Sequence, residues 1–189
     1  MILGNCLFSF KNESTPVPDE YITNAIISVS NTEATRIGEG AFASCRSLSS
    51  VDLPNVTQIG DYAFNGCREI TSISFPYAET IGDLSFLSCQ KLASVNIPNV
   101  REIGEAAFRY CKVLGSITLP SCTKIGKLAF GSCKRGFVMH ILSNSVCEAG
   151  QNFLDDTTVS AIYVPASLVD SYKAAQNWSA YASKIYAEP

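Results

Sequence analysis

The chain has 189 residues, of which 47% are hydrophobic and 16% charged, and its formal net charge is −3 with an isoelectric point near 5.2. This length and apolar content suffice for one elongated domain with a substantial core. The slightly acidic balance argues against nucleic acid and anionic membranes as partners, because both attract basic surfaces. No run of 18 apolar residues predicts a membrane span.

Residues 1–36 are interpreted as an N-terminal segment and capping coil. The opening MILGNCLFSF lacks a basic n-region and a small-residue cleavage site, so it is not interpreted as a signal peptide. If the protein is exported, its signal sequence has been removed, lies in a longer parent chain, or is replaced by a route that needs none. The polar residues 11–20 contain two prolines and predict a linker. Val29 lies eight residues before Ile37, just as Val51 lies eight residues before Ile59. This equal spacing predicts that Val29 belongs to the strand of a truncated leading coil.

Residues 37–133 carry one 22-residue pattern five times without insertion. The first copy reads I-G-x-x-A-F-x-x-C-x-x-L-x-x-V-x-L-P from Ile37, and later copies begin at Ile59, Ile81, Ile103 and Ile125. A fixed period of this length is typical of a solenoid. Each coil can bury its apolar side chains only against its neighbours, so the array needs several repeats and two caps.

Each repeat divides into two halves. The L-x-x-V-x-L-P half predicts a strand that the proline ends, because proline has no N–H to donate, and stacked coils make these strands a parallel sheet. The A-F-x-x-C half predicts a helical or 3-10 turn on the other side. A glycine column at Gly38, Gly60, Gly82, Gly104 and Gly126 indicates either an unusual φ or close approach of neighbouring coils.

The pattern also predicts a structural ladder of stacked side chains. Its members are Phe42, Phe64, Phe86, Phe108, Phe130, Cys45, Cys67, Cys89, Cys111 and Cys133. Buried thiols, disulfides and metal or catalytic sites are all considered for the cysteines. Cβ vectors in register point the same way, and five cysteines cannot pair completely, which favours buried thiols. The absence of C-x-x-C argues further against zinc.

This consensus resembles the BspA-like class of bacterial leucine-rich repeats, through its A-F-x-x-C-x-x-L-x-x-I-x-L-P string over residues 37–133. Ser85 replaces alanine in the third repeat, and Gly136 replaces leucine in the fifth. The resemblance implies an α/β solenoid, a right-handed leucine-rich-repeat-type parallel-β superhelix of about six coils, curved with its sheet on the concave side. It also implies an adhesion role on bacterial or host-interacting surfaces.

The repeat loosens after residue 133 but continues to residue 165, the expected end of the solenoid. Residues 139–141 occupy the strand positions of the fifth repeat, and a sixth, atypical repeat contains one inserted residue. Residues 166–189 predict a C-terminal helical cap with Ser167 as N-cap. Its Tyr172 and Trp178 are expected to cover the open end of the solenoid. The final string resembles the ending of bacterial proteins of this class, which suggests a natural terminus.

The sequence contains only weak candidates for a catalytic or metal-binding motif. His140 and Cys147 suggest a thiol dyad, but a loop separates them and no third group orients them. Asp155 and Asp156 could contribute to a calcium site, although no calcium-binding motif accompanies them and a solvated turn explains them as well. We therefore expect no catalytic residue, no metal site and no cofactor. Asn12 and Asn177 match the glycosylation sequon, which matters only on a eukaryotic secretory route.

The outward face of the predicted sheet is the favoured binding surface. Its first four coils carry small polar residues, a composition that also suits any solvated sheet face, whereas the last two carry Val138, His140, Ala161 and Tyr163. The candidate ligand-binding positions are Asp52, Ser74, Asn96, Thr118, His140 and Tyr163.

The sequence predicts a non-enzymatic adhesion module on the cell surface or secreted, which binds a protein or glycan. The alternatives are a phage tail or receptor-binding component associated with the virion, a thiol-dependent enzyme and a structural spacer.

Overall fold

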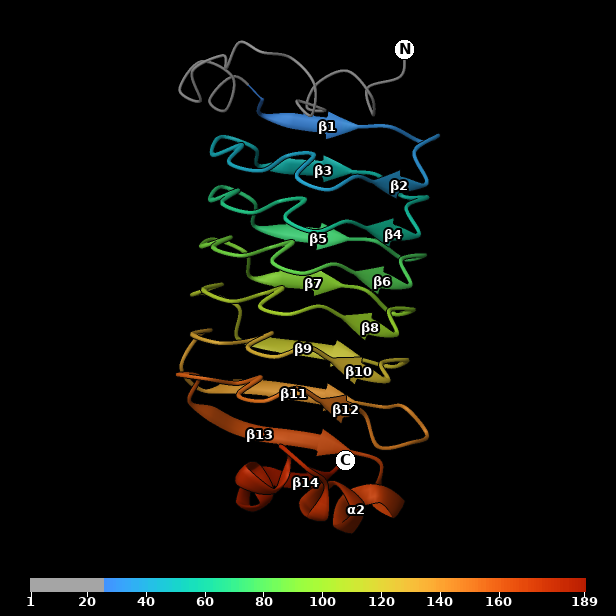
Figure 1. Cartoon of the computed structure of the whole chain (residues 1–189), viewed down its shortest axis with the longest axis vertical. Helices are drawn as coiled ribbons and strands as arrows, with labels where there is room; N and C mark the ends of the chain where they lie inside the picture. Colours follow the sequence, from blue (N-terminus) through green and yellow to red (C-terminus); the bar gives the residue numbers. More distant parts are fainter. Residues whose placement is uncertain (1–25) are drawn as a thin grey trace.

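The structure, a computed structural model, describes residues 26–189. It is a parallel β-solenoid of about 7 turns with about 22 residues per turn, which confirms the predicted fold class (Figure 1). The signal-peptide and linker interpretations, Asn12 and the eighth cysteine, Cys6, lie outside the described residues.

One strand from each coil builds the first file of strands. They are β1 (Ser28–Ser30), β3 (Ser50–Asp52), β5 (Ser72–Ser74), β7 (Ser94–Asn96), β9 (Ser116–Leu119), β11 (Phe137–Ile141), β13 (Val159–Val164) and β14 (Ile185–Ala187). They pair in parallel as β1–β3, β5–β7 and β9–β11–β13–β14. Val29 pairs with Val51, so the strand predicted around Val29 is present beside that of the first full repeat.

A second file of short strands runs beside the first (Figure 1). It consists of β2 (Arg36–Ile37), β4 (Gln58–Ile59), β6 (Thr80–Ile81), β8 (Glu102–Ile103), β10 (Lys124–Ile125) and β12 (Glu148–Ala149), joined as one six-stranded parallel sheet. Sequence reasoning missed it, because each of these strands has two residues, of which only the second is buried (an isoleucine, or Ala149 in β12), and two residues are too few to show an alternating pattern. Each coil from β1 to β12 therefore has two strands, and in the four regular coils from β3 to β10 the corner between them contains a proline.

The core consists of stacked identical side chains. The rings of Phe42, Phe64, Phe86, Phe108 and Phe130 lie in file, with neighbouring centroids 5.1 to 5.4 Å apart. Beside them, each cysteine of the column after Cys45 donates its S–H to the carbonyl of the phenylalanine one coil earlier, as Cys89 does to Phe64 at 3.3 Å. Thr157 replaces the cysteine in the last coil, and its hydroxyl donates to the Phe130 carbonyl at 2.7 Å. The column is thus a row of small buried donors.

The outer side of each coil is a pair of tight turns instead of a helix. Bonds from residue i+3 to residue i are present, as from Asn65 N–H to the Tyr62 carbonyl, but no helix is assigned between residues 26 and 165. Alternate N–H groups reach the next coil instead, as Phe64 does to the Ser85 carbonyl at 2.7 Å. The A-F-x-x-C half thus forms tight turns with the i+3 to i bonds of a 3-10 turn, and it does not extend into a helix because these bonds alternate with bonds to the next coil.

Positive φ angles recur at two positions in these turns, neither of them in the glycine column. One position lies two residues after that glycine (Gly40, Tyr62, Leu84, Ala106, Leu128, Asn152) and the other one residue before the cysteine (Ser44, Gly66, Ser88, Tyr110, Ser132, Asp156). The glycines of the column itself allow neighbouring coils to approach each other closely. A Cβ on Gly104 would lie 2.6 Å from the Asp83 nitrogen, whereas one on Gly38, in the first coil, meets nothing within 4 Å.

The C-terminal cap closes the last coil. It contains the 3-10 helices η1 (Ala166–Leu168) and η2 (Ser179–Lys184) and the α-helix α2 (Val169–Ala174). The N-cap assigned to Ser167 is wrong, because Pro165 already starts the first turn and no side chain caps either helix. Trp178 is fully buried with its ring 4.7 Å from that of Phe153, so it covers the open end as expected. The strand β14, which sequence reasoning also missed, then pairs with β13.

Candidate functional site

The outward face of the first file presents two residues in each regular coil, and the second of them stands at the position suggested by the sequence. Ser30, Asp52, Ser74, Asn96, Thr118, His140, Tyr163 and Tyr186 succeed one another along it. The first five are exposed, and they are small or polar. Asn96 donates its side-chain amide to the Ser74 hydroxyl at 2.9 Å, so part of this row is bonded from coil to coil. We call this row of eight the outward file.

The C-terminal end of the outward file is aromatic. The ring of His140 stacks on that of Tyr163 at 4.9 Å, and Tyr186 lies 6.1 Å further along. His140 Nδ1 lies 3.0 Å from both carboxylate oxygens of Glu188, which holds the imidazole in place. Tyr186 is 46% exposed, so its ring can accept a partner. The sequence interpretation did not include Tyr186 or Glu188, because both depend on the missed strand β14.

Val138 and Ala161, the apolar residues expected on the outward face beside this file, are less exposed than the sequence predicts. Val138 is half-buried and Ala161 is buried at 7% exposure. The reason is a shift in register between β11 and β13, where Val138 pairs with Ala161 but Phe137 pairs with Val159, so that Ser160 is the extra residue. The aromatic surface of this end is therefore formed by the half-buried rings of His140 and Tyr163 and the exposed ring of Tyr186.

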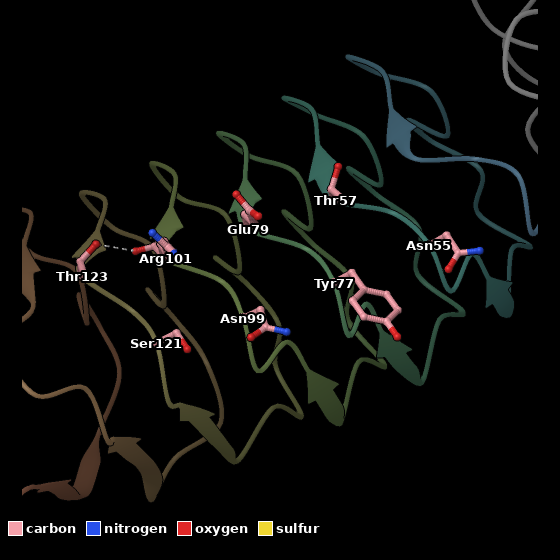
Figure 2. A pocket seen from close by; sticks show the side chains of 8 residues that line it. All are labelled: Asn55, Thr57, Tyr77, Glu79, Asn99, Arg101, Ser121 and Thr123. Carbon is pink, nitrogen blue, oxygen red and sulfur yellow. Dashed lines mark hydrogen bonds between the residues drawn. The ribbon is translucent and has the colours of Figure 1, made fainter.

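A groove of about 660 Å³ runs along the corner between the two files of strands. Figure 2 shows its two rows of side chains, one after the proline corner and one at the start of the second file. The rows are Asn55, Tyr77, Asn99 and Ser121, and Thr57, Glu79, Arg101 and Thr123.

Several polar groups of the groove already bond from coil to coil. The amide of Asn99 donates to the Pro76 carbonyl at 2.7 Å, and the Thr123 hydroxyl donates to the Arg101 carbonyl at 3.1 Å. The phenol ring of Tyr77 is 58% exposed and is the largest side chain free to meet a ligand in this groove. Sequence reasoning missed the groove because it depends on the unpredicted second file.

Burial holds the thiols of the cysteine column in their neutral form. Burial raises the pKa of Cys45 to about 11 and that of Cys89 and Cys133 to about 12. A neutral buried thiol is a poor nucleophile. His140 and Cys147 do not form the suggested dyad, because His140 bonds to Glu188 on the outward face while Cys147 is fully buried against Cys122.

The remaining motifs have structural explanations. Asp156 has a positive φ of 54° in a turn, and Asp155 lies 3.8 Å from Arg109 in a partly exposed ion pair. Among residues 26–189, no three side chains of the metal-binding types gather into a site. The Asn177 amide donates to the Ala149 carbonyl at 2.7 Å, so glycosylation there would break a bond that holds the cap. Over the same residues, none of the helices has the length and apolar content that crossing a bilayer requires.

Comparison with known families agrees with this architecture. A family model described as BspA type leucine-rich repeat region matches the chain with 6 copies, over residues 21–136 and 57–179. A comparison with curated proteins gives no match.

Proposed function

The chain belongs to the BspA-type leucine-rich repeat family, and we propose from that premise that it is a non-enzymatic binding module whose outward file receives an extended segment of a protein partner. The observation that carries this proposal is the aromatic end of the file, formed by His140, Tyr163 and Tyr186 next to a floor of small polar side chains. Such an arrangement offers anchors at one end and close backbone approach along the rest.

The size of the outward file suits a peptide. Neighbouring coils of a parallel sheet lie ~4.8 Å apart, so eight coils extend over roughly 34 Å, about the length of ten extended residues. The exposed hydroxyls and amides of Ser74, Asn96 and Thr118 can exchange hydrogen bonds with a partner's main chain or with a glycan. Repeat arrays commonly bind through such extended faces.

A position on the cell surface, or secretion, is part of the same proposal. Family members are often surface-associated, and adhesion is the role that this setting gives to a binding scaffold. The partner would then be a protein or a glycan on another surface.

The test is a binding screen of the intact chain against immobilised extracellular-matrix proteins and a glycan array. For a partner found in this way, we expect H140A and Y163A each to weaken binding by roughly ten- to a hundredfold, as for interface anchors. Y77A is the matched control, because Tyr77 is an aromatic residue that lies in the corner groove, outside the outward file, and is more exposed than His140 or Tyr163. Loss of binding in Y77A with none in H140A or Y163A would move the site to the groove and refute the proposal.

A further inference from the structure

Two buried cysteines outside the column lie against each other near the C-terminal cap. The sulfur atoms of Cys122 and Cys147 are 3.8 Å apart, and both side chains are fully buried. Cys122 precedes β10 and Cys147 precedes β12, so they belong to neighbouring coils. The chemistry of this pair has no part in the binding function.

The geometry of this pair differs from that of the cysteine column. Column cysteines are spaced by the repeat, and each sulfur of the coils after the first donates to a carbonyl. Lys124 pairs with Glu148, so a strict register would place Val146, not Cys147, beside Cys122. Cys147 is therefore displaced by one residue from the register of the two strands. The argument that Cβ vectors in register point the same way therefore does not apply here, and the two sulfurs face each other.

We propose that Cys122 and Cys147 are a disulfide site, oxidised by thiol–disulfide exchange with a small-molecule disulfide while the chain folds. A disulfide needs its sulfurs at about 2.05 Å, an approach within reach of side-chain rotation from their present contact. In the exchange, one thiolate attacks the oxidant to form a mixed disulfide, and the second thiolate displaces the oxidant's remaining thiol. The two cysteines lose two electrons and two protons, and the oxidant leaves as two thiols.

The timing of oxidation follows from the way the cap covers Cys147. The Tyr172 hydroxyl accepts a hydrogen bond from the Cys147 N–H at 2.9 Å, and the Trp178 indole donates to the Cys147 carbonyl at 2.7 Å. The hydrogen bond to Cys122, together with burial, raises the pKa of the Cys147 thiol far above its ordinary range. Thiolate is the reactive form, so exchange occurs before the cap docks and is slow afterwards.

The cross-link has a structural consequence for the cap. Tyr172 and Trp178 both hold the backbone of Cys147, and that residue would be tied covalently to the preceding coil. The oxidised cap therefore opens less often than the reduced cap. Since cleavage of a folded protein tracks its opening, we expect proteolysis within residues 174–189 to be about tenfold slower in the oxidised chain.

The experiment refolds the reduced, denatured full chain in a mixture of glutathione and glutathione disulfide. After free thiols are blocked, we expect the intact mass to show the loss of two hydrogen atoms. A tryptic digest without reductant should then contain the peptides 113–124 and 136–173 joined through Cys122 and Cys147. Adding the same oxidant to the folded, reduced chain should produce this species far more slowly.

The matched control is C122V, because valine occupies the same position in two earlier coils, at Val56 and Val100. It should fold, form no joined peptide and show the same cap proteolysis with and without oxidant. C89A should fold and keep the joined peptide. Recovery of a folded chain with Cys122 and Cys147 both free, or with Cys147 joined to another cysteine, would overturn the proposal. These outcomes require no partner and do not bear on the binding role.

Discussion

Ser85 is expected to reduce the stability of the solenoid, and its replacement by alanine should raise it. The side chain is completely buried, and its hydroxyl oxygen has no hydrogen-bond partner. The same position in neighbouring coils holds the buried residues Ala63 and Ala107. Ser85 therefore buries a hydroxyl in a place shaped for a methyl group.

The size of the effect follows from the cost of an unsatisfied buried polar group, ~1–3 kcal/mol. S85A removes one oxygen atom and leaves the inter-coil bond from the Phe64 N–H to the backbone carbonyl in place. We expect a gain of about 1–2 kcal/mol in the free energy of unfolding. In a chain of this length, this gain corresponds to a rise in Tm of roughly 2–8 °C.

Urea and thermal unfolding followed by circular dichroism measure this change in S85A and in the reverse variant A107S. The reverse variant should lose about as much as S85A gains, because it buries the same group in the next coil. A drop in stability on S85A, or no loss in A107S, would refute the reasoning. It would mean that the hydroxyl finds an acceptor in the folded chain.

Three further predictions concern backbone and thiols. G104A should cost at least about 2 kcal/mol, because backbone atoms of the preceding coil block a Cβ, while G38A should be within ~0.5 kcal/mol of the parent chain by urea unfolding. Y62N should gain up to about 1 kcal/mol in the same assay, since Tyr62 has a φ of 57°, a region that asparagine tolerates, and Asn152 already fills this position in the last coil; a loss would show that the exposed ring packs usefully. Burial raises the pKa of the column thiols, so their contribution is complete below the ordinary thiol pKa near 9 and is lost between about pH 9 and 12. Unfolding across this range should show C89A losing less stability with pH than the parent chain, by about 1.4 kcal/mol per pH unit; equal slopes would contradict the assignment.

The strict period predicts the features that depend on register. A spacing of 22 residues is enough to place Val29 beside Val51 and to stack the phenylalanine rings, since parallel strands of equal coils pair equivalent residues. The exposed positions Asp52, Ser74, Asn96 and Thr118 follow from alternation along those strands. Their role in binding remains a prediction.

The turns could not be predicted in the same way. Their positive φ falls at positions where the residue type varies, from Gly40 to Tyr62 and Leu84, so no composition marks it. It is imposed by hydrogen bonds to the next coil, such as that from the Tyr62 N–H to the Asp83 carbonyl at 2.8 Å. Such bonds form only when the stack exists, and they offset the cost of a left-handed residue, ~1–2 kcal/mol. The second file is likewise a property of the stack.

The chemically distinctive groups gather where the repeat breaks down. An array of equal coils repeats the same surface, so a distinct site needs a departure from the pattern, and here the departures lie in the last two coils and the cap. His140 lies in β11, the strand of the fifth repeat, at the position that holds Thr118 in β9, and Cys147 lies in the longer corner between β11 and β12. Tyr186 reaches Tyr163 only because the chain returns from the cap to pair with β13. In the proposed function, the regular coils thus set the length of the outward file, and the irregular C-terminal end supplies the proposed anchors. The proposed disulfide site lies at the same end of the chain and is independent of binding.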